Sequence, residues 1–515
     1  MPKDRVVVVG AGIGGLSAAL DLAAQGFEVD VVERAAGPGG KMRRVAVDGA
    51  AIDAGPTVMT MRWAFDALFT RAGLDLDAFV QLTPLSILAR HFWPDGTQLD
   101  LFADLDSSAE AIGIFAGARD KAGFIRFHAD AQRMFKTLHT TFLAAPRPSM
   151  TELAARVGFG RILDLAALSP FETMWARLGT YFKDPRLRQL FGRYATYCGS
   201  SPFAAPATLM LIAHVEQDGV WSVDGGMHNL ARALERAAIA KGARFHYQAH
   251  VDEIVIDRHR AAGVTTIDGR RFAADAIVFN GDRNALRGGL LGAAAADASP
   301  GPAVATSLSA LTWLIRAQID DAPLTRHNVY FSSDYPREFA DIAAGRLPND
   351  PTIYVCAQDR DDAPHQPDAD RLLVLVNAPA IGAAGPLNSA EIDQCATRTF
   401  QRLNRSGLRL RNPTLELATP ETFEALFPGS KGALYGMASH GWDAPFRRPG
   451  ARTRVPGLYL AGGSVHPGAG VPMASLSGQL AAQTMMADRA STRASSRAAM
   501  PGGTSTRSAR AAPTG

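Results

Sequence analysis

The sequence predicts an α/β fold with a parallel sheet near its N-terminus, and three observations support this prediction. The valine run Val6 to Val9 is followed by a glycine-rich turn and by an Ala/Leu-rich helical stretch, Leu16 to Gln25. A second apolar run, Glu28 to Val32, completes a strand–helix–strand unit whose two strands are expected to lie parallel. Near the other end of the chain, Leu458 to Gly463 forms a further apolar strand that again leads into glycines and a helix.

The composition is typical of a globular protein without a large charged surface. The chain has 515 residues and 47% of them are hydrophobic, which is enough for two or three domains with their own cores. Because the formal net charge is only +3, we expect no nucleic-acid partner. The cysteines Cys198, Cys356 and Cys395 are far apart and odd in number, which argues against disulfides and against a metal site. This pattern favours a reducing, cytoplasmic compartment.

Membrane contact, if the protein makes it, is expected to be peripheral. We find no secretory signal before the first strand and no apolar stretch of about 18 residues that could span a bilayer.

Periodicity and composition divide the chain into a discontinuous first domain, a helical region, a second domain and a tail. The first domain is predicted to comprise residues 1–75, 215–295 and 450–488. Residues 76–214 are mostly helical in pattern, and residues 296–449 contain β-rich runs typical of an α+β domain. Residues 489–515 contain almost nothing that could form a core, so we expect a disordered tail.

The turn after the first strand carries the spacing of a dinucleotide-binding loop. Gly10, Gly12 and Gly15 form a GxGxxG pattern between the strand and the helix, and Gly14 lies in the same turn. Gly10 permits the tight turn, Gly12 lets the backbone approach a pyrophosphate, and Gly15 lets helix and strand pack closely. The N-terminus of the helix then offers free N–H groups and the positive end of its dipole to the phosphates.

Glu33 ends the second strand and is the predicted ribose ligand. It follows Gly10 by about 20 residues, the separation at which a carboxylate accepts hydrogen bonds from an adenosine ribose. A chance glycine cluster in an ordinary turn is the alternative. The register of strand, glycines, helix and acid favours dinucleotide binding.

Two further glycine-containing segments favour FAD over NAD. Pro38 to Lys41 follows the acid, and Asp53 to Pro56 follows a predicted hairpin, so the glycine track is longer than one nucleotide requires. The expected cofactor contacts in these two segments are Gly40, Lys41, Gly55 and Pro56. A further expected contact is Val251, much later in the chain, at the start of a predicted strand.

The closing segment predicts the flavin end of the same site. After Ala461 the chain runs through a glycine-rich turn into a helix predicted from Met473 to Met486. A helix N-terminus aimed at the flavin ring would stabilise negative charge as the ring is reduced. The expected contacts are Gly462, Gly463, Gly470, Val471, Pro472 and Met473. His466 in this turn is the candidate catalytic base, and packing within the turn is its alternative role.

These segments resemble the flavin-dependent carotenoid desaturases of the bacterial and fungal phytoene-desaturase type, in the wider amine-oxidase-like superfamily. The resemblance spans nearly the whole chain and is carried by Val6 to Glu33, Gly39 to Lys41, Asp53 to Thr57, Trp221 to Met227 and Ala461 to Gly478. Its most specific part is His466 to Gly470. Three segments look most like the hydroxyneurosporene (methoxyneurosporene) desaturases: Arg193 to Tyr197, Tyr354 to Arg360 and Ala438 to Trp442.

The resemblance implies a Rossmann-like FAD-binding domain, an α+β substrate domain at residues 296–449 and a helical, membrane-associated region at residues 76–214. It implies introduction of the C3–C4 double bond into 1-hydroxy or 1-methoxy acyclic carotenoids of photosynthetic purple bacteria, with FAD as hydride acceptor. Typical phytoene desaturases carry a Gln-Ser-Ala-x-Phe-Arg-Pro type segment where this chain has Ala438 to Arg447, which argues against phytoene as the substrate. His440 and Arg447 of this segment are weaker candidates for substrate or flavin contacts.

The substrate would be a lipophilic carotenoid, and the enzyme would lie on the cytoplasmic side of the inner or intracytoplasmic membrane. The stretch Phe124 to Tyr197 interleaves aromatic and basic residues, as interfacial helices do, although an ordinary helical core is the simpler interpretation for most of these aromatics. Oxygen or a membrane quinone would accept the electrons. The sequence leaves open the bond position, the catalytic base and the oligomeric state.

Several other functions are compatible with the same fold. Phytoene desaturase and carotene isomerase are alternatives from the same family. An amine oxidase is less compatible, because Ala461 to Ser464 offers no cysteine to tether FAD. A non-catalytic escort protein for prenylated cargo is the alternative from a different functional class.

Overall fold

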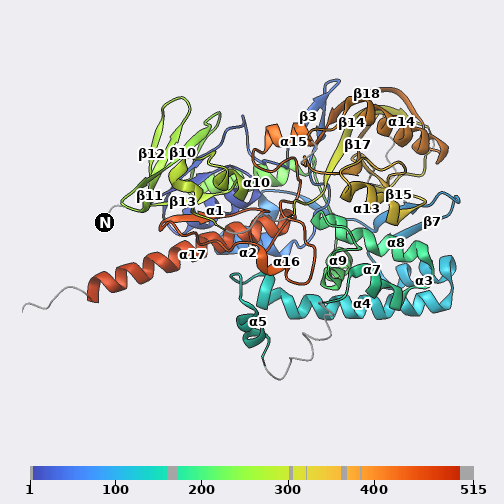
Figure 1. Ribbon diagram of the computed structural model, residues 1–515, viewed down its shortest axis with the longest axis horizontal. Helices are drawn as coiled ribbons and strands as arrows, with labels where there is room; N and C mark the ends of the chain where they lie inside the picture. The colour runs from blue at the N-terminus through green and yellow to red at the C-terminus, as the bar shows by residue number, and fades with distance from the viewer. Residues whose placement is uncertain are drawn as a thin grey trace, which may run out of the picture.

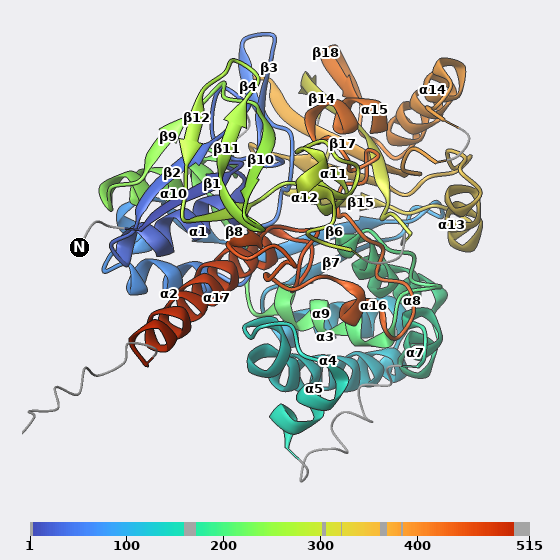
Figure 2. The same cartoon turned by 60° about the vertical axis from the view of Figure 1, so that its left-hand side comes forward.

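Two β-sheets stand side by side above a layer of helices (Figures 1 and 2). The computed structural model describes residues 4–158, 171–300, 305–320, 322–360, 368–382 and 385–498. The strands of the first sheet come from the predicted dinucleotide-binding domain, and most strands of the second come from the predicted substrate domain. The predicted α/β fold class is confirmed.

The first sheet has five strands in the order β19-β13-β1-β2-β9, and every neighbouring pair is parallel. Its strands are β1 (Arg5–Val9), β2 (Glu28–Val32), β9 (Arg244–His246), β13 (Ala276–Phe279) and β19 (Leu458–Leu460). Strands from three separated parts of the chain therefore share one sheet. Their carboxyl ends meet at one edge, where parallel α/β sheets bind ligands.

The side chains of β1 point alternately to the two faces of this sheet, and both faces are covered, since Val6 to Val9 are all buried. Val6 and Val8 pack against helices, whereas Val7 and Val9 pack against a three-stranded antiparallel sheet. The helices are α1 (Ile13–Ala24), α2 (Trp63–Arg71), α10 (His228–Ala240) and α17 (Val471–Ala498). The antiparallel strands are β10 (Val251–Asp257), β11 (Arg260–Thr266) and β12 (Arg271–Ala273). A valine run buried on both sides is typical of a parallel sheet.

The second sheet has seven strands in the order β18-β14-β17-β16-β15-β6-β7. Its strands are β6 (Ile87–Phe92), β7 (Gln98–Phe102), β14 (Ser309–Ile319), β15 (His327–Tyr330), β16 (Ile353–Ala357), β17 (Asp370–Ala378) and β18 (Leu410–Ala418). The helices that accompany it are α13 (Tyr335–Ala343), α14 (Ser389–Arg405) and α15 (Pro420–Leu426).

Residues 76–214, predicted to be mostly helical, also contribute strands to the second sheet. β6 and β7 come from this range and extend the second sheet, with β6 lying parallel to β15. The free edge of β15, more than 200 residues further along the chain, supplies the backbone partners that make β6 a strand. This pairing is long-range, so local periodicity did not reveal it.

The helical layer, which lies beneath the second sheet and the middle of the molecule, contains α3 (Leu105–Ala116), α4 (Ala118–Leu138), α5 (Met150–Val157), α7 (Met174–Tyr181), α8 (Pro185–Gly192) and α9 (Leu211–Gln217). Most of its aromatic side chains are core residues, as the simpler interpretation predicted. The buried ones are Phe124, Phe127, Phe135, Phe142, Tyr181, Phe182, Phe191 and Tyr194. Phe171 is exposed instead. Phe159 and Arg161 belong to the same stretch of aromatic and basic residues, but they lie outside the described residues.

The last helix is longer than the sequence predicts. α17 begins at Val471 and continues to Ala498, so residues 489–498 of the predicted disordered tail are helical. Arg489 anchors this extension through an ion pair of 2.7 Å with Asp4 near the start of the chain. Residues 499–515 of the predicted tail lie outside the described part of the chain. No helix in the described part is long and apolar enough to cross a bilayer.

The remaining elements are short. They are β3 (Arg44–Val47), β4 (Ala50–Asp53), β5 (Leu82–Pro84), β8 (Trp221–Val223), α11 (Arg283–Arg287), α12 (Ala293–Ala296), α16 (Ala444–Arg447), the 3₁₀ turns Leu76–Ala78, Arg193–Cys198 and Ala207–Met210, and the π turn His139–Leu143.

Candidate functional site

A single cavity of about 1340 Å³ joins the first sheet, the second sheet and the helical layer. Nearly all the predicted cofactor residues line it. They are Gly10, Gly12, Gly14, Glu33, Gly40, Lys41, Gly55, Pro56, Val251, Gly462, Gly463, Gly470, Val471, Pro472 and Met473. Gly15 and the candidate base His466 do not line it. The tertiary structure thus brings residues from both ends of the chain to one place.

The glycine turn after β1 leaves the N-terminus of α1 open toward the cavity. Gly10 has a φ of 97°, which an L side chain rarely adopts, and no side chain caps the helix at Gly12. A Cβ on Gly12 or Gly14 would lie 2.9 or 2.6 Å from the side-chain amide of Asn280, so neither position has room for one. A Cβ on Gly15 would overlap the carbonyl oxygen of Gly10, which explains why Gly15 supports helix packing instead of lining the cavity.

Glu33 is held in place at the end of β2 by backbone donors. Its buried carboxylate accepts hydrogen bonds from the N–H groups of Ala11, at 2.6 Å, and Ala35, at 2.7 Å. These bonds leave further lone pairs on both oxygens, which face the same cavity as the glycine turn. The carboxylate is therefore fixed where it can accept hydrogen bonds from ribose hydroxyls.

Asn280 is a residue of this site that the sequence analysis missed. It follows β13 directly and donates a hydrogen bond of 3.3 Å from Nδ2 to the carbonyl oxygen of Gly10. Its side chain also lies against Gly12, Gly14 and Gly462, so it braces both glycine turns. The available signal was its position after a predicted strand, because the carboxyl ends of parallel strands meet at the ligand edge.

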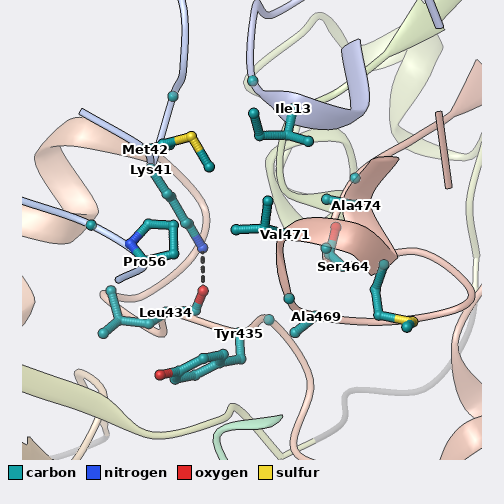
Figure 3. A pocket seen from close by; sticks show the side chains of 18 of the residues that line it. Ile13, Lys41, Met42, Pro56, Leu434, Tyr435, Ser464, Ala469, Val471 and Ala474 are labelled. Atoms are coloured by element: carbon teal, nitrogen blue, oxygen red, sulfur yellow. Dashed lines mark hydrogen bonds between the residues drawn. The ribbon is translucent and has the colours of Figure 1, made fainter. Parts of the chain in front are cut away.

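The two helices that begin at this site, α1 and α17, pack closely together. The hydroxyls of Ser17 and Ser475 are 2.9 Å apart, and a Cβ on Gly478 would overlap the carbonyl oxygen of Gly14. Figure 3 shows Ile13 and Val471, the first residues of the two helices, across the pocket from Lys41 and Pro56. Two helix N-termini therefore converge on one pocket, and each favours negative charge there.

Lys41 connects the first domain to the segment that follows α15. Its Nζ donates a hydrogen bond of 2.7 Å to the carbonyl oxygen of Leu434, drawn as a dashed line in Figure 3. Burial lowers the pKa of Lys41, and the nearby carboxyl of Asp282 opposes this shift. The predicted contact between Lys41 and the cofactor is thus accompanied by a structural role.

These features fit an extended dinucleotide. The glycines exclude side chains from the turns, the helix N-terminus has free N–H groups for a pyrophosphate, and Glu33 supplies a ribose acceptor. Among the described residues, no group of three or more His, Cys, Asp or Glu side chains could hold a metal ion.

The other part of the cavity is a long apolar space between the second sheet and the helical layer. Its helical wall includes Leu138, Phe142, Leu143, Leu209, Ile212 and Val215. Its floor is a row of side chains that lie in register across four strands, Val329, Tyr354, Leu375 and Thr312. Because cross-strand partners point to the same face, this row forms one continuous surface.

A buried polar group interrupts this apolar space. Arg193, from the 3₁₀ turn, donates to the hydroxyl of Tyr197, whose own hydroxyl donates a bond of 2.9 Å to Glu216. All three residues line the cavity. Beside them, the hydroxyls of Tyr354 and Thr57 are 2.7 Å apart. Since Thr57 follows Gly55 and Pro56, the polar part of the cavity lies next to the predicted cofactor segment.

His466 does not reach the reacting space. Its Nε2 lies 3.0 Å from the carbonyl oxygen of Phe142 and 2.9 Å from that of Ala145, so the ring ties the closing turn to the helical layer. Burial lowers the pKa of His466 to about 4. The structure therefore favours the packing role over the catalytic one, because no part of the residue lines the cavity.

The two weaker candidates are also outside the cavity lining. His440 accepts a hydrogen bond of 3.3 Å from the backbone N–H of Ser201. Arg447 pairs with the exposed carboxylate of Asp443. The neighbouring Arg448 does line the cavity, and its buried guanidinium donates to the carbonyl oxygens of Gly463 and Met437 at 3.0 and 2.8 Å.

Comparison with known proteins gives consistent matches over nearly the whole chain. The family model described as flavin containing amine oxidoreductase matches residues 13–486. A protein of Rubrivivax gelatinosus described as hydroxyneurosporene desaturase is 50% identical over 98% of this chain and 97% of its own length. A protein of Rhodobacter capsulatus with the same description is 47% identical over 95% of this chain and 99% of its own length.

Solved structures agree on the fold. An oxidoreductase from Methanosarcina mazei matches with a TM-score of 0.58 and 17% identity, over 94% of this chain and 100% of that one. A variant of putrescine oxidase also matches with a TM-score of 0.58, at 14% identity over 95% of this chain and 100% of that one. At these identities the likeness concerns the fold alone.

Proposed function

This chain belongs to the flavin-containing amine oxidoreductase family, together with the hydroxyneurosporene desaturases, and we propose that it is a FAD-dependent carotenoid desaturase. Its substrates are 1-hydroxy or 1-methoxy acyclic carotenoids of the neurosporene type, into which it introduces the C3–C4 double bond. The resemblance predicted from the sequence is confirmed by its relatives, and the protein is an oxidoreductase.

The observation that carries this proposal is the continuity of the cavity. One space runs from the glycine turns at Gly12 and Gly462 to the apolar floor at Leu375. Its volume of about 1340 Å³ exceeds the roughly 300–1,000 Å³ of common small-molecule pockets. A dinucleotide at one end and a polyene along the apolar wall account for both the size and the two kinds of lining.

The reaction removes two hydrogens from neighbouring carbons. Bound FAD would supply the hydride acceptor. A hydride leaves the allylic C4, a proton leaves C3, and the double bond forms between them. Loss of hydride at an allylic carbon makes the adjacent proton acidic, so a weak base or water suffices. The apolar wall orients the chain of carbons and excludes water from most of its length.

Each turnover also requires an external electron acceptor, which is oxygen or a membrane quinone. Assays under air, and under argon with an added quinone, distinguish these two acceptors.

The helical layer is the part of the protein that we assign to the membrane surface. Its exposed apolar side chains include Ile114 of α3, Ile125 of α4, Met150 of α5 and Phe171 before α7. Phe171 packs against the exposed Trp442, with ring centroids 5.5 Å apart. Exposed apolar side chains on the helical layer, another part of which forms a wall of the apolar cavity, suit extraction of a substrate that dissolves in lipid.

The test is expression in cells that accumulate 1-hydroxyneurosporene and, separately, in cells that accumulate phytoene. We expect a red shift of the pigment absorption by one conjugated double bond with the hydroxylated substrate alone. Coloured product from phytoene would identify a phytoene desaturase instead. Isomers without a change in hydrogen content would identify a carotene isomerase, and no conversion in either strain would favour the escort function.

A further inference from the structure

Resting on this proposed function, we infer that the hydroxyl of Tyr335 binds the oxygen substituent of the carotenoid and so selects oxygenated substrates over hydrocarbons. Tyr335 is the first residue of α13 and lines the cavity, although its side chain is only 4% exposed. Its hydroxyl has no hydrogen-bond partner in the described part of the chain. A buried hydroxyl without a partner is costly, and a ligand oxygen in the cavity would satisfy it.

Other buried polar atoms near Tyr335 also lack a hydrogen-bond partner in the described part of the chain, namely Oε1 of Glu338, Oγ of Ser332 and Nε of Arg193. Glu338 and Ser332 do not line the cavity, and Arg193 already donates to Tyr197 and Glu216, so the hydroxyl of Tyr335 is the buried donor in the described lining that makes no bond at all. The hydroxyl of Thr352 donates a bond of 2.6 Å to the buried carboxyl of Glu338. Arg193, Tyr197 and Glu216 bind one another on the facing wall.

The ring of Tyr335 is held rigidly by other aromatic side chains. Its centroid lies 5.0 Å from that of Phe339, 6.0 Å from Trp175 and 6.1 Å from Phe203. A hydroxyl on a fixed ring is already oriented for its partner, so little entropy is lost on binding. Burial, reinforced by the carboxyl of Glu338, raises the pKa of Tyr335 and keeps the hydroxyl protonated as a donor.

Tyr335, Thr352 and Asn377 form a polar part of the cavity lining, and its position suits a substrate oxygen close to the reacting bond. Thr352 lies two residues before Tyr354 and Asn377 lies two residues after Leu375, and both line the cavity. Because β16 and β17 are antiparallel, the two residues lie toward the same end of the paired strands. Tyr354 in turn contacts Thr57 beside the predicted cofactor segment. In the proposed substrate only C2 separates the oxygen-bearing C1 from C3, so an oxygen held at this wall would keep C3 and C4 near the cofactor.

The donor role also explains why both kinds of oxygenated substrate would be accepted. A tyrosine O–H can donate to a hydroxyl oxygen or to a methoxy oxygen. A hydrocarbon offers no acceptor and would leave the hydroxyl unpaired in a site that excludes water. Sites built around a buried hydrogen bond reject the analogue that lacks it.

The experiment compares wild-type protein with Tyr335→Phe on three substrates of equal chain length: the 1-hydroxy carotenoid, its 1-methoxy ether and the parent hydrocarbon. Tyr330→Phe is the matched control, because Tyr330 is a buried tyrosine of β15 that does not line the cavity. FAD content and the melting temperature of each variant establish that it is folded.

We expect wild type and Tyr330→Phe to prefer both oxygenated substrates over the hydrocarbon. In Tyr335→Phe, kcat/KM for the oxygenated substrates should fall about tenfold, the value of one net hydrogen bond, while the hydrocarbon is unaffected. An equal change for all three substrates, or none, would overturn the inference. Equal use of hydrocarbon and hydroxylated substrate by wild type would also overturn it, even if the variant fails to fold. Failure of the proposed function is distinguishable, because wild type would then convert none of the three substrates or the hydrocarbon alone.

Discussion

The imidazole Nε2 of His466 lies 3.0 Å from the backbone carbonyl oxygen of Phe142. This contact joins the turn before α17 to the end of the long helix of the helical layer, and the side chain of His466 is only 3% exposed. We therefore predict that His466→Gln, whose amide can place a donor near the same carbonyls, retains kcat within about twofold. His466→Leu should lose roughly 1 to 3 kcal/mol of stability, because it leaves two buried carbonyls unpaired.

Stability against pH provides a second measurement on the same variants. The pKa of His466 is lowered from 6.5 to about 4 by burial, so the folded state binds fewer protons than the unfolded state between these values. The stability associated with the neutral ring is complete above pH 6.5 and is lost as the pH falls toward 4. Wild type should therefore lose about 3 kcal/mol more than His466→Gln across this window in denaturant titrations. A kcat that falls by several orders of magnitude in His466→Gln, with unchanged stability, would restore the catalytic role.

Glu33→Gln should weaken FAD binding by a factor on the order of 10 to 100. The carboxylate accepts hydrogen bonds from Ala11 and Ala35, and an amide must turn its NH₂ group toward one of these donors. The expected change is measured by titrating apo-protein with FAD and following flavin fluorescence. Glu28→Gln on the same strand is the control, since Glu28 pairs with Arg244 at the surface. Equal affinities of the two variants would contradict the assignment of Glu33.

Gly478→Ala should lower both the FAD content and the melting temperature. Alanine in a helix interior is favoured over glycine by about 1 kcal/mol, but here its Cβ would overlap the carbonyl oxygen of Gly14 and push α17 away from α1. Gly113→Ala in α3 is the matched control, because its Cβ would meet only the flexible side chain of Lys121. Calorimetry should show a lower melting temperature for Gly478→Ala and an unchanged or higher one for Gly113→Ala. A higher melting temperature in both variants would mean that α1 and α17 can separate without affecting the site.

The double variant Phe171→Asp with Trp442→Asp should reduce binding to vesicles of anionic phospholipid by at least tenfold in flotation assays. Phe171 is 78% exposed, and charged residues at an inserted position oppose burial in the interface. Ile267→Asp is the control, since Ile267 is also apolar and is 68% exposed, but lies in the turn between β11 and β12. Activity toward substrate dissolved in detergent should be unchanged in all variants. Full vesicle binding by the double variant would place the membrane contact elsewhere.

The residues that sequence alone identified are those whose role is set by their neighbours in the chain. The strand from Arg5 to Val9, the glycines after it and the start of α1 form one local unit, and backbone geometry makes its function readable from spacing. The turn between β19 and α17 is local in the same sense, which is why Gly462 and Val471 were predicted and lie in the cavity.

Only the tertiary structure determines the roles of residues whose contacts lie far away in the chain. Asn280 became a site residue because β13 pairs with β1, and β6 became a strand because β15 offers it a free edge. For His466 the sequence left a catalytic and a packing role open, and the contact with the carbonyl of Phe142, more than 300 residues away, favours packing. Tyr335 carries no motif, and only the folded cavity shows that its hydroxyl is buried without a partner. Spacing along the chain fixes backbone conformation, whereas burial and hydrogen-bond satisfaction are set by contacts between segments that the fold alone brings together.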